Sequence, residues 1–127
     1  MYIVQLISSI NFKLAQSLGI QEDPDYTDSL IQRSELYVAY WDLLTLIWMP
    51  VSGALMILGS ESWPYFSLVA GAIYFDVAGR EAVKNLSFRH EGLRVGARAQ
   101  QKVYFASYIA MGCLGVLVAF YALSYLA

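Results

Sequence analysis

Most hydrophobic positions of the chain are gathered in three long apolar runs. They extend over residues 37–59, 63–79 and 103–127, and their only charged residues are Asp42 and Asp76. A bilayer core of about 30 Å needs roughly 17–25 helical residues. Because runs of this length without a polar face are typical of membrane spans, the pattern predicts an all-α integral membrane protein with three transmembrane helices.

Prolines and serines predict where these helices bend and begin. Pro50 lies inside the first run and cannot bond the Leu46 carbonyl, so a kink is expected there. Ser62 is placed to cap the second helix, with Pro64 in the first turn, where its missing N–H costs nothing.

Residues 1–20 are less apolar and carry a helical period. Their large aliphatic residues recur at that spacing: Ile3, Ile7, Ile10, Leu14 and Leu18. An interfacial amphipathic helix on the cytoplasmic leaflet fits this pattern best. The alternative is a fourth span, which would move the N-terminus outside and leave Lys13 in lipid at a cost of a few kcal/mol.

Charge is concentrated in two segments outside the runs. Residues 21–36 hold five acids and one arginine, whereas residues 80–102 hold six cations against two glutamates. Good helix formers surround Gly92, so the second and third spans are expected to continue as a helical hairpin that turns near that glycine. The two segments either pair with each other or remain two solvated loops.

The distribution of cations predicts the orientation in the membrane. With three spans, every Lys and Arg lies on one side, which the positive-inside rule makes cytoplasmic. The N-terminus is then cytoplasmic and the C-terminus lies on the opposite side. A bacterial inner membrane or an organelle membrane suits this arrangement.

Composition agrees with a lipid environment. The chain is 58% hydrophobic and 14% charged, whereas soluble domains carry about 25% charged residues. A net charge of −2 gives nucleic-acid binding no electrostatic support. A single cysteine, Cys113, excludes an internal disulfide.

Helix register places several polar residues at similar depth near the cytoplasmic interface. Asp42 and Arg80 each lie 19 residues from Glu61, and a turn at Gly92 sets Arg80 opposite Tyr104. The hypothesis is an intramembrane charge cluster of five residues: Asp42, Asp76, Arg80, Tyr104 and Tyr108. Such groups are usually paired and often functional. In the simpler interpretation, Asp42 sits at headgroup level and Arg80 neutralises Asp76.

Small residues form a stripe along the third span: Gly112, Gly115, Ala119 and Ala122. Ser67 and Gly71 repeat that spacing on the second span. Small residues let membrane helices approach closely. The stripe predicts helix packing within the chain, with other subunits as additional partners in a hetero- or homo-oligomer.

Motifs for catalysis and cofactors are missing from the sequence. It contains no Gly-rich phosphate loop, no H-E-x-x-H, no C-x-x-C and no serine elbow. Haem would need axial ligands within the spans, and the lone histidine, His90, lies outside them. We therefore expect no cofactor, no metal and no catalytic residue.

Three classes of function fit the sequence. The favoured class is a non-catalytic subunit or assembly factor of a larger membrane complex. The second is a homo-oligomeric transporter or channel that uses the Asp42, Asp76 and Arg80 cluster. The third is an anionic-lipid binder or lipid enzyme. The residues expected to contact anionic lipid or a partner are Lys84, Arg89, Arg94, Arg98 and Lys102.

Overall fold

The computed structural model describes residues 2–21 and 23–127, so Met1 and Glu22 of the predicted N-terminal and acidic segments lie outside the described residues. The described residues form six helices: α1 (Tyr2–Ile10), α2 (Phe12–Ser17), α3 (Ser29–Thr45), α4 (Trp48–Ile57), α5 (Trp63–His90) and α6 (Arg98–Leu126). An isolated antiparallel bridge joins Thr27 to Val95.

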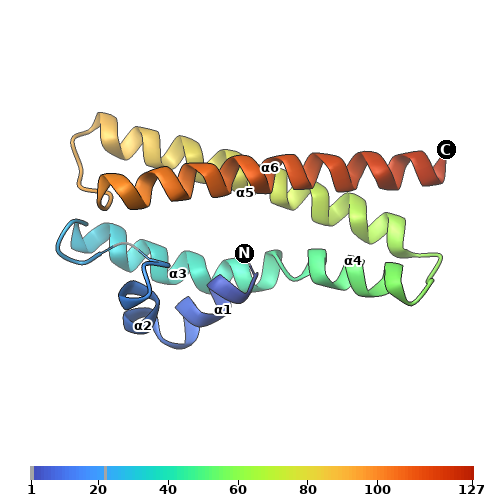
Figure 1. The fold of residues 1–127 in the computed structure, drawn as a ribbon, viewed down its shortest axis with the longest axis horizontal. Helices are drawn as coiled ribbons and strands as arrows, with labels where there is room; N and C mark the ends of the chain where they lie inside the picture. The colour runs from blue at the N-terminus through green and yellow to red at the C-terminus, as the bar shows by residue number, and fades with distance from the viewer. Residues whose placement is uncertain (1, 22) are drawn as a thin grey trace.

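Helices α3 and α4 follow one another along one edge of the molecule (Figure 1). Together they cover nearly all of the first span expected over residues 37–59, with an interruption inside it. The helix is interrupted at Leu46 and Ile47, where the Met49 amide turns back to the Leu46 carbonyl at 3.4 Å. Pro50, in the first turn of α4, has no amide hydrogen for that carbonyl, so the kink expected from Pro50 takes the form of a short interruption between α3 and α4.

Helices α5 and α6 are antiparallel and cross each other (Figure 1), and they make the most extensive contact between any two helices described. The link between them turns at Gly92 and Gly96, with φ of 74° and 98°. Such positive φ angles suit glycine because it has no Cβ. Ser62 directly precedes α5, but no side-chain cap bond is described for it, and its hydroxyl instead contacts the Ser60 hydroxyl at 2.9 Å. The expected Ser62 cap is therefore wrong.

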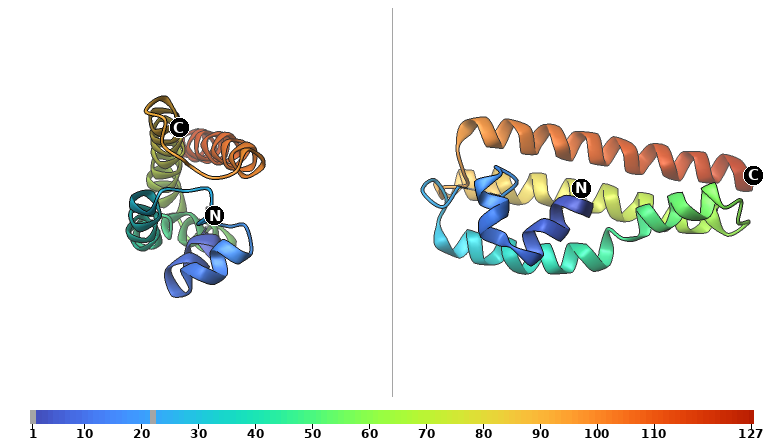
Figure 2. Two further views of the ribbon diagram at one scale, coloured as in Figure 1. Left: turned by 90° about the vertical axis from the view of Figure 1, so that its left-hand side faces the viewer. Right: turned by 60° about the horizontal axis from the view of Figure 1, so that its bottom comes forward.

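The N-terminal segment forms two short helices rather than the single helix expected over residues 1–20. Asn11 separates them: its φ is −145°, and its side-chain oxygen accepts a hydrogen bond from the Leu14 amide at 3.0 Å. With nine residues in α1 and six in α2, each is shorter than the roughly 17 residues that a span requires. Helix α1 packs against α3 (Figure 2).

Two stretches among the described residues are long and apolar enough to cross a membrane by length and composition. They are Ser29–Ile57, which includes the break, and Arg98–Leu126. Helix α5 is of similar length but is not among them, since its apolar part gives way to charged residues from Asp76 onward. In both candidates, 17% of the most apolar window is buried inside the molecule.

Burial in this molecule is partly inverted: some polar side chains are inside and many large apolar ones are outside. Ser8, Ser52 and Ser67 are at most 2% exposed, whereas Ile3 and Ile10 on α1 are 71% and 77% exposed. A small apolar core nevertheless joins α3, α5 and α6, and it consists of Leu46, Tyr74, Val77, Ala78 and Met111. The core lies where the helices meet, directly beside the break between α3 and α4.

Candidate functional site

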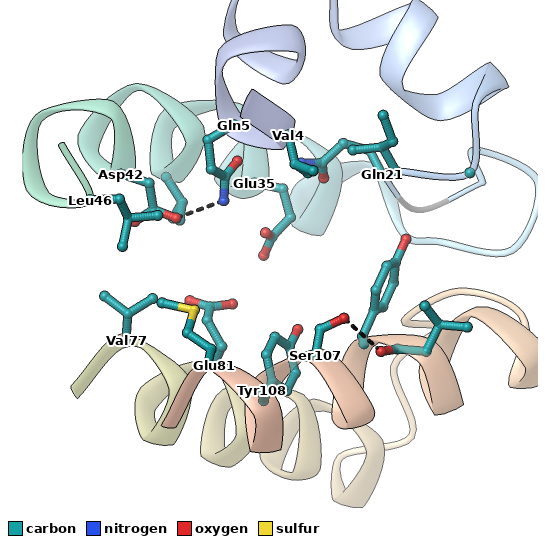
Figure 3. Close-up of a pocket in the computed structure, with 16 residues that line it drawn as sticks. Val4, Gln5, Gln21, Glu35, Asp42, Leu46, Val77, Glu81, Ser107 and Tyr108 are labelled. Carbon is teal, nitrogen blue, oxygen red and sulfur yellow. Dashed lines mark hydrogen bonds between the residues drawn. The ribbon is translucent and has the colours of Figure 1, made fainter. Parts of the chain in front are cut away.

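A cavity of about 260 Å³ lies between α1, α3, α5 and α6 (Figure 3). We call it the inner cavity. Core residues such as Leu46 and Met111 and further aliphatic residues line part of it. Its polar lining residues are Gln5, Gln21, Glu35, Asp42, Glu81, Tyr104, Ser107 and Tyr108. Along this stretch α3 lies apart from α5 (Figure 1), whereas α4 packs against α5.

Asp42 is the most deeply buried acid in the cavity, with 1% of the residue exposed. Its Oδ2 accepts a hydrogen bond from Gln5 Nε2 at 2.7 Å (Figure 3). Its Oδ1 and the Gln5 Oε1 are both buried, and neither has a hydrogen-bond partner among the described residues. Two neighbouring acceptors therefore remain unsatisfied, which is costly inside a protein.

Lys84 joins two other carboxylates at the edge of the cavity. Its Nζ lies 2.7 Å from Glu35 Oε1 on α3 and 2.6 Å from Glu81 Oε2 on α5. These side chains are 12–21% exposed. Burial lowers the pKa of Lys84, but the two carboxylates outweigh it and raise that pKa above its ordinary value. Lys84 is therefore charged and links α3 to α5, rather than reaching out to lipid or a partner.

Two tyrosines of α6 border the cavity. The Tyr108 hydroxyl accepts a hydrogen bond from Asn85 Nδ2 at 3.1 Å, and its ring meets Phe105 edge to face at 5.7 Å. Tyr104 lies one turn earlier on the same lining face. The positions of both rings are set by α5 and α6.

The charge cluster expected from register is brought together in part. Asp42, Tyr104 and Tyr108 line the inner cavity, but Asp76 and Arg80 do not. These two pair with each other at 3.7 Å on an outer face of α5, with Asp76 73% and Arg80 46% exposed. The reason is helical phase: Val77 and Glu81 face inward, so residues one position earlier point away.

The acidic and basic segments are in contact within the chain. The Arg94 amide donates to Asp28 Oδ2 at 3.0 Å, and the Arg94 guanidinium lies 3.3 Å from Asp28 Oδ1. The Asp28 amide donates in turn to the Arg94 carbonyl at 3.1 Å. Hydrogen bonds from Arg94, the backbone one above all, lower the pKa of Asp28. The link between α5 and α6 is thereby tied to the start of α3.

The remaining basic residues lie at the surface. The Arg89 guanidinium stands over the Phe105 ring at 5.9 Å. Arg98 and Lys102 are exposed at the start of α6, which leaves them available to an external partner.

The small-residue stripe of α6 faces α5. A Cβ added at Gly115 would come within 2.6 Å of the Gly71 carbonyl oxygen, and one at Gly112 would lie 3.5 Å from the Ala78 Cβ. Ala119 also approaches Gly71, and Ala122 is fully buried. The stripe therefore packs helices within the chain.

A second hollow runs along the outside of α5 and α6. This apolar groove of about 570 Å³ is open and is lined mainly by small and aliphatic residues, including Ala78, Gly79, Gly112 and Leu117. Tyr108 borders both the groove and the inner cavity.

The sequence hypothesis missed several polar residues of the cavity, among them Gln5, Glu35 and Glu81. A usable signal existed for one of them. Seven-residue steps from Ser67 along α5 lead to Tyr74 and then to Glu81, so Glu81 continues the buried face. Gln5 and Glu35 offered no such signal, because their positions depend on how α1 and α3 pack.

Within residues 2–21 and 23–127, no group of three or more His, Cys, Asp or Glu side chains is placed to hold a metal ion. The chain matches no known protein family, no curated protein and no solved structure.

Proposed function

We propose that this chain is an integral membrane protein that serves as a non-catalytic subunit or assembly factor of a larger membrane complex. The observation that carries the proposal is the inverted burial. Serines and Asp42 are inside, while leucine, isoleucine and aromatic side chains cover the outside of α3, α4 and α6. A water-soluble fold buries its apolar residues instead, and exposed apolar patches of this extent mark contacts with lipid or protein.

In this proposal the first part of α5 is the second span, between α3–α4 and α6. Its first half packs against both α4 and α6, so it is flanked by the two apolar candidates. The end that carries Arg94, Arg98 and Lys102 faces the cytoplasm, and the C-terminus lies on the opposite side. Helices α1 and α2 lie at the cytoplasmic leaflet, with Ile3 and Ile10 turned toward lipid.

The subunit role is supported by how little of the apolar surface this chain covers by itself. Exposed large side chains on α6 include Ile109, Leu117 and Phe120, each about two-thirds exposed. The apolar groove lies beside them. A helix of another subunit is a suitable cover for such a surface, because membrane helices associate through close packing.

Transport by a homo-oligomer is the second candidate, and one observation favours it: the inner cavity holds a buried acid, Asp42, with an unsatisfied oxygen. Ionisable groups at such depth often mark ion or substrate pathways. The outward position of Asp76 and Arg80 removes them from that route.

Topology and assembly can be tested on one set of proteins. Single cysteines at Ser60 and Gly92, in a Cys113→Ala background, should react with a membrane-impermeant thiol reagent from opposite sides of the membrane. Native mass spectrometry after extraction in mild detergent should then show a complex with other membrane subunits. Labelling of both cysteines from one side would refute the three-span topology, and a homogeneous monomer would refute the subunit role.

A further inference from the structure

We infer that the inner cavity is a binding site for a small organic amine in its protonated, ammonium form. The juxtaposition behind this inference is the buried Asp42 carboxylate and the Gln5 amide, one hydrogen bond apart at the wall of the cavity, with one oxygen of each left without a partner among the described residues. It goes beyond the subunit role and does not depend on it.

The unsatisfied atoms define the chemistry of the ligand. Gln5 donates to Asp42, and this bond leaves Gln5 Oε1 and Asp42 Oδ1 without a donor among the residues described. Both are acceptors, so they require N–H or O–H groups from a ligand. An ammonium group carries up to three N–H donors and can satisfy both oxygens at once.

The charges around the cavity favour a cation. Glu35, Asp42 and Glu81 supply three carboxylates, and Lys84 is the ammonium placed among them. Lys84 is bound by Glu35 and Glu81 at 2.6–2.7 Å, and no ion pair within 4 Å joins Asp42 to a cation among the described residues. A hydrogen bond that also neutralises a buried charge is about twice as strong as a neutral one.

The size and lining of the cavity favour an organic ligand over a bare ion. About 260 Å³ is far more than the roughly 30 Å³ share of one water, and it lies just below the range for drug-sized ligands. Val38, Val77 and Met111 supply aliphatic surface, and Tyr104 and Tyr108 supply aromatic faces that attract cations. The carboxylates, by contrast, are not grouped for a metal in the described residues.

Binding can be measured on the full chain in lipid nanodiscs by isothermal titration calorimetry. Benzylammonium is the probe, with two matched comparisons: benzyl alcohol, which lacks the charge, and benzyltrimethylammonium, which lacks N–H donors. Asp42→Asn removes the charge without changing the shape of the side chain. Asp76→Asn is the control, since Asp76 lies outside the cavity with 73% of its side chain exposed.

The expected result is saturable binding of benzylammonium that Asp42→Asn weakens by about tenfold to a hundredfold and Asp76→Asn leaves unchanged. Both comparison ligands should bind more weakly than the primary amine. No binding of benzylammonium, equal binding of either comparison ligand, or an equal loss in both variants would overturn the inference.

A cavity-filling variant keeps the test decisive if Asp42→Asn does not fold. Val38→Phe adds bulk to the aliphatic wall and leaves the polar groups in place. It should abolish benzylammonium binding. Unchanged binding to this variant would place the ligand elsewhere and overturn the inference.

Discussion

The helices are joined by small residues at one end of the bundle and by long charged residues at the other. In what we call the packed half, the first part of α5 meets α4 through serines and the second part of α6 through glycine and alanine. In the cavity half, α1 and α3 face the second part of α5 and the first part of α6 across Glu35, Glu81 and Lys84. Small residues allow backbones to touch, and long charged ones hold them apart.

The interruption at Leu46 separates a region where small side chains join the helices from a region where charged side chains join them. On one side, α4 and α5 share the buried hydroxyl contact between Ser52 and Ser67. On the other, α3 is joined to α5 by an ion network around Lys84 and leaves the inner cavity open. The packed half is therefore held by close contacts between backbones, and the cavity half by charged side chains beside an open space.

Removal of Lys84 should lower the free energy of unfolding more than any other change considered. Lys84→Met leaves Glu35 and Glu81 close together without their shared cation, and loss of one member of a buried pair costs about 3–5 kcal/mol. We expect a loss near the lower value of about 3 kcal/mol, since the pair keeps some exposure. Equilibrium unfolding in mixed detergent micelles measures it. Lys102→Met, at an exposed lysine, is the control, and equal effects from both variants would contradict the network.

Gly71→Val should open the packed half with the next largest effect. A Cβ there would meet the Gly115 carbonyl oxygen at 2.5 Å, and a backbone atom cannot move aside as a flexible side chain can. The expected cost is about 1–3 kcal/mol, read from the same unfolding assay. Gly79→Val on the same helix is the matched control, because no described atom lies within 4 Å of its added Cβ. Tolerance of Gly71→Val would show that α5 and α6 do not touch here.

Ser52→Ala removes a single hydrogen bond from the packed half. It leaves the buried Ser67 hydroxyl without its interhelical partner. Hydrogen bonds between membrane helices contribute about 0.6 kcal/mol on average, so we expect a loss of about 1 kcal/mol or less. The control is Ser124→Ala, whose hydroxyl bonds the Tyr121 carbonyl of its own helix. A larger loss in the control would argue against the contact between α4 and α5.

The smallest expected effect is a loss of stability at low pH in the link between α5 and α6. Hydrogen bonds from Arg94 lower the pKa of Asp28 in the folded state, so this carboxylate stabilises the fold above the unfolded pKa. That contribution is lost as pH falls through the lowered folded pKa, below about pH 4. Amide hydrogen exchange of residues 93–97 should report this loss as protection that decreases when the pH falls. In Asp28→Asn that decrease should be absent. Asp25→Asn should retain it, because Arg94 contacts Asp25 through the carbonyl oxygen; an unchanged decrease in Asp28→Asn would refute the assignment.

Helix positions were readable from the sequence because long apolar runs and Pro50 act locally. The break falls at Leu46, whose carbonyl cannot bond Pro50. The turn at Gly92 was also predictable, since its φ of 74° suits glycine. Each of these features depends on residues a few positions apart.

The inner cavity was less predictable because it depends on packing between distant helices. The predicted register agrees with the presence of Asp42 and Tyr108 in one cavity, but register does not fix which face of a helix a residue occupies. Asp76 and Arg80 belong to the same predicted register and point outward. The pairing of Gln5 with Asp42 depends on where α1 lies against α3, and the break at Asn11 that sets this has a weak signal in sequence.

Inverted burial has a consequence for how this chain would change during evolution. On a lipid-facing surface, leucine, isoleucine, valine and phenylalanine can replace one another at little cost, so exposed aliphatic positions that no other subunit covers would be free to drift. The small and polar interior has no such freedom: Gly71, Gly115 and Ser67 are held by contacts at their backbones or hydroxyls. Descendants of a common ancestor would thus share a sparse spacing of glycines, serines and one aspartate, while their leucines differ.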